Sequence, residues 1–515
     1  MNWKKETDGI KIRKKLATKQ GGKEAVDLQH AKGRLSLRER IEKLLDKGSF
    51  QEQGKIAGIS DIDDKGDIQA FTPANFILGF GKINGNQIVI AGEDFTVKGG
   101  SPNPAGLRKS VYTEELALNY KLPLVRLHEG GGGSVAGPSK KGRSSGGDAV
   151  FSKSRFKSVA DTLKVIPVVS AALGPVAGLP AARFVASHFR VMTKRTSQIL
   201  VAGPAVVERA FGKKLTKEEL GGSNIHRMNG VTDNVADTEE DAFNQISRFL
   251  SYMPQNIYEL SSQKIIDDPV NRKEEDLLAI IPKDKKKSYE MREVIEKIFD
   301  HDSFFEITRY FGQGIITGFA RINGYSVGIL ANDSNFYAGS MSSKGAQKTS
   351  RFIKTCDTFH IPVVSLVDEP GFLIGPEAEL EATILHGTEA VLTVTESTIP
   401  WCSVIIRKSY GVAAAAHYGP DGYVLAWPSA ESGALPIEGG VAVAFKKEIS
   451  ESVNPEAKRK EIEDALNSQQ NTFARAESFS VHEIIDPRDT RTYLAEWAER
   501  IQSQLRVKCI QVNQL

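Results

Sequence analysis

The chain has 515 residues, of which 40% are hydrophobic and 25% charged, with a formal net charge of +3. That length exceeds what one hydrophobic core usually serves, so two large domains are expected. The near balance of charge gives no reason to expect nucleic acid or an anionic membrane as a partner. No apolar run approaches the roughly 18 residues of a membrane span, so a soluble protein is expected.

Cysteine and histidine usage argues against metal or disulfide chemistry. Cys356, Cys402 and Cys509 lie far apart, which indicates a reducing compartment: the cytoplasm, or the mitochondrial matrix in a eukaryote. The histidines show no metal-ligand spacing, so no metal site is expected. The basic segment 1–19 lacks an apolar core and is interpreted as a solvated helix, not as a secretory signal.

In chain order, the residue pattern of the first half predicts alternating helices and strands. The pattern indicates an amphipathic helix at 37–45, then a hairpin turning at Asn84-Gly85, a pair typical of a type I′ turn. A helix at 107–120 and a buried strand at 122–127 follow. A second helix at 150–163 and a second buried strand at 166–173 complete the unit.

The second half repeats this order. Residues 38–52, RERIEKLLDKGSFQE, return as REVIEKIFDHDSFFE at 292–306, and residues 77–127 match without gaps a segment 239 positions later. The expected elements are therefore duplicated. They are a helix at 291–299, a hairpin at Asn323-Gly324, a helix at 346–359, a strand at 361–367, a helix at 379–396 and a strand at 399–407.

Alternation of strands and helices predicts an α/β fold with largely parallel sheets, present in two copies. The expected domains span residues 1–260 and 289–515. The polar stretch 261–288, rich in Lys, Asp and Glu, is interpreted as the linker.

Both copies place small residues after the last buried strand, at 174–182 and 408–416. Loops that leave such strands are common working positions. Small side chains let a substrate carbonyl approach backbone N–H groups, and a helix beginning there favours a developing negative charge. Two oxyanion holes are therefore predicted. The alternative is close packing of a helix on a sheet, which also favours Gly and Ala.

The run Glu129–Ser134 contains four glycines but fits neither a P-loop nor a Rossmann fingerprint, so it is interpreted as a flexible lip over a binding site. Its repeat partner carries Asp368 and Glu369. These acids are interpreted as caps in preference to a general acid and base. With no nucleophile elbow and no Ser-His-Asp set, the chain offers backbone donors and little side-chain chemistry.

From about residue 20 to the end, the chain resembles the β (carboxyltransferase) subunits of propionyl-CoA, acetyl-CoA and methylcrotonyl-CoA carboxylases. The matching segments together are specific, although each one alone is not. They are HAKGRLSLRERIEKLLDKGSF (30–50), EDFTVKGGS (93–101), ELGGSNIHRMNGVTDNVADTEEDA (219–242), DEPGFLIG (368–375), HGTEAV (386–391), RKSYG (407–411) and LAWPSAE (425–431).

The resemblance implies two crotonase-like domains (ClpP/crotonase superfamily) in a ring of six subunits. CoA would bind mainly on the N-terminal domain and biotin mainly on the C-terminal one. By position, the oxyanion pairs fall at Gly178-Leu179 and at Val412-Ala413, next to Gly411. The implied substrate contacts are Gly131, Gly132, Gly133, Ala177, Ala414 and Ala415.

The implied activity is transfer of a carboxyl group from carboxybiotin to the α or vinylogous carbon of an acyl-CoA, as in fatty acid metabolism. The chain has no Ala-Met-Lys-Met biotinylation site and no ATP-grasp segment, so biotin carboxylase and biotin carboxyl carrier subunits are expected partners of a homohexamer. Family members read AGGA and YGGA where this chain has Leu179 and Val412. Ala415 stands at a position linked with the choice of acyl group.

Three other functions remain open. The same fold could serve a biotin-dependent decarboxylase or transcarboxylase. A crotonase-type hydratase or isomerase would need a positioned Glu and would leave the second copy unexplained. A non-catalytic acyl-CoA-binding or assembly subunit would fit if the changes at Leu179 and Val412 removed activity.

Overall fold

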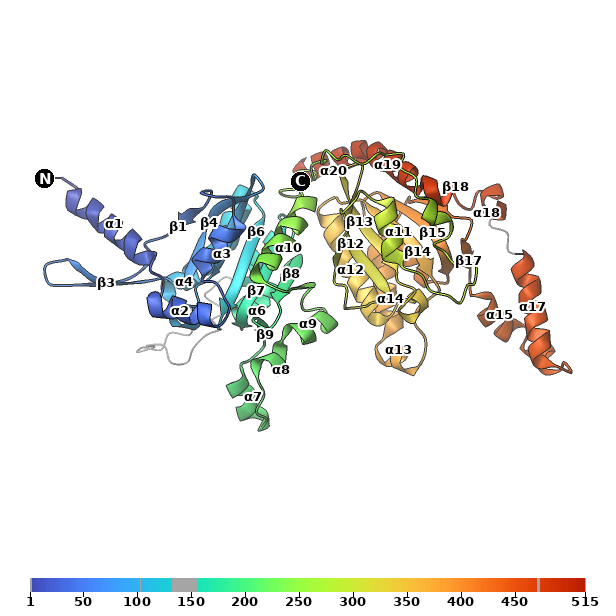
Figure 1. Cartoon of the computed structure of the whole chain (residues 1–515), viewed down its shortest axis with the longest axis horizontal. Coiled ribbons are helices and arrows are strands. Elements are labelled where there is room, and N and C mark those ends of the chain that lie inside the picture. The colour runs from blue at the N-terminus through green and yellow to red at the C-terminus, as the bar shows by residue number, and fades with distance from the viewer. Residues whose placement is uncertain (1, 102, 132–154, 470–472, 515) are drawn as a thin grey trace. The chain divides into compact units, whose positions relative to one another are not determined.

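The computed structural model describes residues 2–101, 103–131, 155–469 and 473–514. The chain divides into two compact units, Met1–Glu259 and Leu260–Leu515 (Figure 1). Residues 261–288, for which the sequence analysis expects a linker, belong to the second unit. Leu277 lies in the hydrophobic core of that unit. No helix in the described ranges is long and apolar enough to cross a membrane.

Each unit is built on an eight-stranded sheet with the same strand order. Each sheet begins with a short edge strand antiparallel to a hairpin, and parallel strands follow. In unit 1 the sheet order is β1-β4-β5-β6-β7-β8-β10, with β9 beside β7; in unit 2 it is β11-β12-β13-β14-β15-β16-β18, with β17 beside β15. The predicted α/β duplication is confirmed.

The strands of unit 1 are β1 (Gln51–Gln53), β4 (Phe76–Ile83), β5 (Asn86–Glu93), β6 (Leu124–Gly130), β7 (Val168–Ala177), β8 (Phe189–Thr193), β9 (Gln198–Leu200) and β10 (Asn234–Ala236), with a separate hairpin of β2 (Gly58–Ile62) and β3 (Ile68–Pro73). Those of unit 2 are β11 (Phe305–Ile307), β12 (Ile315–Ile322), β13 (Tyr325–Asn332), β14 (Val363–Glu369), β15 (Trp401–Tyr410), β16 (Tyr423–Ala426), β17 (Glu431–Gly433) and β18 (Glu483–Ile484).

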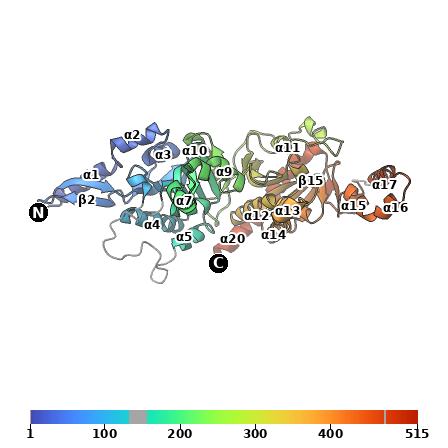
Figure 2. The same cartoon turned by 90° about the horizontal axis from the view of Figure 1, so that it is seen from below.

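Helices cover both faces of each sheet (Figure 2). The helices of unit 1 are α1 (Lys4–Ala17), α2 (Lys23–Ala31), α3 (Leu37–Leu44), η1 (Lys98–Gly100), α4 (Pro104–Tyr120), α5 (Arg155–Thr162), α6 (Leu179–Val185), α7 (Pro204–Phe211), α8 (Lys217–Gly221), α9 (Ser223–Asn229) and α10 (Glu239–Tyr252). Helices α3 and α10 pack on one face of its sheet, and α4 packs on the other (Figure 2).

Unit 2 contains the helices η2 (Glu275–Leu278), α11 (Met291–Ile298), η3 (Tyr337–Gly339), α12 (Ser343–Thr358), α13 (Pro376–Leu380), α14 (Thr383–Thr395), η4 (Ala413–His417), α15 (Ile437–Ala444), α16 (Lys446–Ser450), α17 (Pro455–Gln469), α18 (Phe473–Glu477), η5 (Pro487–Asp489), α19 (Thr490–Arg500) and α20 (Gln502–Gln514). The single helix expected at 379–396 is wrong. Ala382 adopts a left-handed conformation with φ 55°, which separates α13 from α14. The helix expected at 150–163 is described only from Arg155 onward.

Both predicted hairpin turns are confirmed. Asn84 and Asn323 each have φ 50°, and the glycine after each also has a positive φ. An aspartate caps each turn. Asp46 accepts hydrogen bonds from the N–H groups of Asn84 and Gly85, as Asp300 does from those of Asn323 and Gly324.

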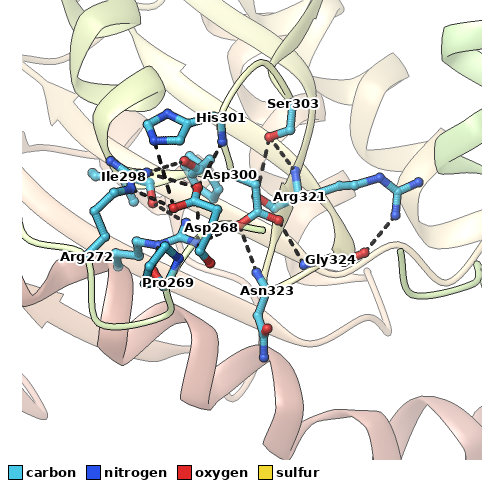
Figure 3. A network of polar contacts seen from close by, with 12 residues as sticks. Asp268, Pro269, Arg272, Ile298, Asp300, His301, Ser303, Arg321, Asn323 and Gly324 are labelled. Carbon is cyan, nitrogen blue, oxygen red and sulfur yellow. Dashed lines mark hydrogen bonds and ion pairs between the residues drawn. The ribbon is translucent and has the colours of Figure 1, made fainter. Parts of the chain in front are cut away.

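A buried polar network joins the Asp300 turn to segment 261–288 (Figure 3). Arg491 on α19 forms ion pairs with Asp300 at 2.9 Å and with Asp268 at 3.3 Å. Asp268 also pairs with Arg272, whose guanidinium donates to the carbonyl oxygens at the end of α11. The segment is therefore held to unit 2 by charge as well as by apolar packing.

We expect Asp300→Ala to lower the free energy of unfolding by about 3 kcal/mol, because it leaves two turn amides without an acceptor and removes one of the two carboxylates that pair with the buried Arg491. The buried Trp401, Trp427 and Trp497 all lie in unit 2, so urea unfolding followed by tryptophan fluorescence measures this loss.

The matched control is Asp46→Ala, since Asp46 caps the equivalent turn but is half-buried and has no ion pair recorded among the described residues. Its expected cost is about 1 kcal/mol, measured by calorimetry. Equal losses for the two variants would show that the Asp300–Arg491 pair adds nothing beyond the turn.

Candidate active site

In both units a central strand of ten residues is followed directly by a glycine with a positive φ. Strand β7 is followed by Gly178 at φ 69°, and β15 by Gly411 at φ 65°. Residues with a side chain rarely adopt this conformation, so glycine is required for the sharp turn. The amides that follow each glycine then lie at the carboxyl end of the sheet.

In unit 1 the turn leaves two amides without partners. The first helical hydrogen bond of α6 joins the N–H of Ala182 to the carbonyl oxygen of Gly178 at 3.0 Å. No recorded hydrogen bond of the described residues uses the N–H of Gly178 or Leu179. Gly178 is exposed, whereas Ala177 and Leu179 are half-buried. Because α6 has only seven residues, the individual amides matter here more than the helix dipole.

In unit 2 the glycine of the turn uses its own amide within the fold, and the two residues expected as donors follow it. The N–H of Gly411 already donates to the carbonyl oxygen of Gly433 at 3.1 Å, which leaves Gly411 a conformational role. The N–H groups of Val412 and Ala413 have no acceptor recorded within the described ranges. The Val412 side chain is 64% exposed, whereas Ala413 is buried. In η4, Ala414 is buried and Ala415 is exposed.

The three glycines expected to contact substrate follow β6. Gly131 is half-buried, and its N–H donates to the carbonyl oxygen of Gly99 at 3.4 Å. Gly132 and Gly133 lie outside the described residues. The structure therefore gives a position for the start of this glycine run only.

A buried carboxylate supports the site segment of unit 1. Glu129 is fully buried and pairs with Arg34 at 3.0 Å and with Arg40 at 2.6 Å. A Cβ placed on Gly174 would meet the Glu129 carboxyl carbon at 2.4 Å. Gly174 therefore lets β7 lie directly against this ion group, and Glu129 is committed to structure.

The two acids at the end of β14 are also committed. Asp368 accepts from Arg407, from the Tyr289 hydroxyl and from the N–H of Lys408. Glu369 accepts from the N–H of Gly371 and approaches His417 at 3.4 Å. Burial raises the pKa of the Glu369 carboxyl above its ordinary value, against the hydrogen bond from His417.

Side-chain chemistry elsewhere in the described ranges is limited. No group of three or more His, Cys, Asp or Glu residues there is placed to hold a metal ion. Burial raises the pKa of the Cys402 thiol and that of the Cys356 thiol above their ordinary value. Neither thiol is therefore prepared to act as a nucleophile. The arrangement offers main-chain donors at two turns.

Sequence reasoning missed a cationic cleft in unit 2. A cavity of about 590 Å³ lies beside the end of β15, lined in part by Lys285–Ser288, Lys408 and Tyr410. Lys286, Lys287 and Lys408 have no acidic partner recorded in the described part of the chain. The run KDKKKS in segment 261–288 was the available signal, but its polarity was interpreted as that of a linker.

A second cavity of about 730 Å³ lies next to the first and has an apolar wall that includes Leu277 and Ile281. Both cavities are lined by Lys285, Arg407 and Glu431. Lys285 and Glu431 form an ion pair at 2.5 Å, and the Tyr410 hydroxyl donates to Glu431 at 3.2 Å. This bridge ties segment 261–288 to β17 and, through Tyr410, to the end of β15.

The chain is similar to proteins of a known family. A model of the carboxyl transferase domain matches residues 28–512. The carboxyltransferase subunit of propionyl-CoA carboxylase from Haloferax mediterranei is 32% identical over 507 residues, covering 96% of this chain and 95% of that protein. Subunit alpha of methylmalonyl-CoA decarboxylase from Propionigenium modestum is 32% identical over 499 residues, with coverages of 96% and 95%.

Among solved structures, transcarboxylase 12S superposes with a TM-score of 0.86 at 31% identity, covering 96% of this chain and 95% of that one. That structure is described as a hexamer assembly with hydrolysed methylmalonyl-coenzyme A bound. The two sheets of equal order fit the duplicated crotonase-like fold, and that prediction is confirmed. The chain belongs to the carboxyl transferase domain family and is a carboxyltransferase of the biotin-dependent acyl-CoA carboxylase type.

Proposed function

We propose that the chain moves a carboxyl group from carboxybiotin, carried by a partner subunit, to the α or vinylogous carbon of an acyl-CoA. The supporting observation is the pair of glycine turns at equivalent strand ends, each with two main-chain amides that have no acceptor among the described residues. Two such turns in one chain suit a reaction in which charge develops on two different oxygens.

We assign the amides of Gly178 and Leu179 to the thioester oxygen and those of Val412 and Ala413 to the biotin ureido oxygen. Gly411 shapes the second turn through its positive φ. The surrounding small residues are proposed substrate contacts, namely Gly131, Gly132, Gly133, Ala177, Ala414 and Ala415. Gly178, Ala177 and Ala413 leave little side-chain bulk next to these N–H groups, which favours close approach of a carbonyl oxygen.

Carboxybiotin, when bound, supplies the carboxyl group as CO2 and a nitrogen that takes the α-proton of the acyl-CoA. The residues of this chain hold the two oxygens, orient the α-carbon toward CO2 and exclude water. As the α-proton leaves, Leu179 and Gly178 donate to the oxygen that gains negative charge. The new carbon–carbon bond then forms on the CO2 carbon.

The proposed partners follow from this division of labour. Biotin carboxylase and a biotin carboxyl carrier subunit would supply the carboxyl group. We propose a homohexameric core, because the transcarboxylase 12S relative is described as a hexamer assembly. Capture of a biotinylated partner with this chain, followed by carboxylation of an acyl-CoA panel with ATP and labelled bicarbonate, tests the function. Absence of labelled product with every acyl-CoA would reject it.

A second candidate runs the same chemistry toward decarboxylation or transcarboxylation. The methylmalonyl-CoA decarboxylase and propionyl-CoA carboxylase relatives are equally similar to this chain at 32% identity. Both directions need the same two turns, so the partner decides between them. Biotin-dependent loss of CO2 from methylmalonyl-CoA, without ATP-dependent carboxylation, would favour this candidate.

We expect Leu179→Pro and Val412→Pro each to lower kcat by about 10²–10³-fold, because each removes one N–H donor. Leu179 is the first residue of α6, where proline fits, and Val412 has φ −67°, close to the proline value. Steady-state carboxyl transfer measures the effect.

The controls are Leu179→Ala and Val412→Ala, which shorten the side chain and keep the N–H. Each should retain kcat within a few-fold of the parent. If an alanine variant loses as much activity as the matching proline variant, the main-chain donor at that turn is not what matters.

We expect a bulky residue at Ala415, such as Ala415→Ile, to shift preference toward shorter acyl chains, because Ala415 is exposed on η4 two residues after Ala413. Relative kcat/KM across acetyl-CoA, propionyl-CoA and longer acyl-CoAs measures the shift. Ala415→Gly is the control of opposite size. Unchanged ratios in both variants would place the acyl chain elsewhere.

A further inference from the structure

Unit 1 contains a buried group of ionisable side chains between its sheet and the helices α4 and α6. The group comes from four elements, and each member is at most 5% exposed. Its members are Glu93 on β5, Glu114 on α4, Arg126 and His128 on β6, and Arg183 on α6. We call these five residues the α6 support group.

The equivalent positions of unit 2 are neutral. Strands β6 and β14 match at a shift of 239 positions, and β7 and β15 at a shift of 233. These shifts carry the support group to Asn332, Ile353, Ser365, Val367 and Ala416. Unit 2 instead places Glu369 and His417 beside Asn332 and Ser365, so the same fold forms without Glu114 and the two arginines, whose presence in unit 1 needs another explanation.

Arg126 ties α6 to its surroundings. Its Nη1 donates to the carbonyl oxygens of Arg183 and Ala186, both at 3.2 Å, at the end of α6. Its Nη2 pairs with Glu114 at 2.8 Å, and Arg183 also pairs with Glu114 at 3.1 Å. Arg183 further donates to the Ser110 hydroxyl on α4. One carboxylate and two guanidinium groups therefore join α6 to β6 and α4.

The same helix starts at the candidate donors. Gly178 precedes α6 and accepts its first helical hydrogen bond, so the amides of Gly178 and Leu179 move with the helix. On the other side of the turn, Gly174 lies against Glu129. The segment from Gly174 to Ala186 is thus held at both ends by buried charge.

Some polar atoms of the α6 support group make no hydrogen bond among the described residues. Glu114 Oε2, Arg126 Nε and Arg183 Nη2 are buried and have no hydrogen-bond partner in the described structure. The group lines a cavity of about 10 Å³, room for a single water-sized molecule. Burial and Arg183 lower the pKa of Arg126, although Glu114 acts against them. Buried ion groups of this kind seldom stabilise a fold more than apolar residues of similar volume.

We propose that Arg126, with Glu114 and Arg183, is a positioning residue for carboxyl transfer: it fixes α6 so that the amides of Gly178 and Leu179 face the thioester oxygen. This inference rests on the proposed function of those amides. Displacement of donors by about 1 Å is enough to reduce a rate by two orders of magnitude. Loss of this support should therefore lower kcat for carboxyl transfer more than it raises KM for acyl-CoA.

The test replaces three members of the group, Glu114, Arg126 and Arg183, with their counterparts in unit 2. Arg126→Ser alone should lower the midpoint of thermal unfolding. It removes one of the two ion partners of the buried Glu114 and the donor to two carbonyl oxygens at the end of α6. The triple variant Glu114→Ile, Arg126→Ser, Arg183→Ala should recover a midpoint close to that of the parent. We expect its kcat to remain at least tenfold below the parent, with KM for acyl-CoA changed less than threefold.

Arg126→Lys provides a second measurement if the triple variant does not fold. It keeps a buried positive charge near Glu114 but cannot match the forked contacts to two carbonyl oxygens. A reduced kcat at an unchanged unfolding midpoint supports positioning. Parental kcat in the triple variant, or in Arg126→Lys, overturns it.

The parent chain separates this inference from the proposed function. If the parent with its biotinylated partner transfers no carboxyl group to any acyl-CoA, the proposed function fails. If the parent is active and the variants match its kcat, the function stands and only the role of Arg126 is rejected.

Discussion

Gly178 and Gly411 each follow a central strand in a left-handed conformation, and this backbone constraint shapes both halves of the chain. A side chain at either position would meet conformational strain, because L-residues rarely adopt such φ values. The sharp turn separates the following amides from the strand ladder before a helix can use them. Backbone N–H groups that would otherwise donate within a helix or sheet can then donate to an oxygen of a ligand.

Such a turn is useful only if it is held still, and the two units achieve this differently. In unit 1, Arg126 and Glu114 hold α6 through charge, while Glu129 supports Gly174. In unit 2, η4 is held by His417, whose carbonyl oxygen accepts from Trp401 and Ser403 and whose ring contacts Ser365. Duplication conserved the turn while its support diverged.

Segment 261–288 shows how a polar composition can mislead. Its charges are not only solvated, because Asp268 and Arg272 join a buried network with Arg491, and Lys285 bridges to Glu431 beside the end of β15. Long charged side chains pair across tertiary structure with residues more than two hundred positions away, and no local pattern records such pairing.

The sequence by itself determined the duplication, the α/β class, the Asn-Gly hairpins and the family, because repeats, hydrophobic periodicity and turn chemistry are local signals. It also pointed to the loops that hold Gly178 and Gly411. Only the tertiary structure decided that the N–H of Gly411 is already taken by Gly433, that Glu129 and Asp368 are internal ion partners, and that Arg126 meets α6. These facts depend on which distant residues come within hydrogen-bonding distance in the folded chain. Burial strengthens each such pair, but neither residue spacing nor composition indicates which residues will pair.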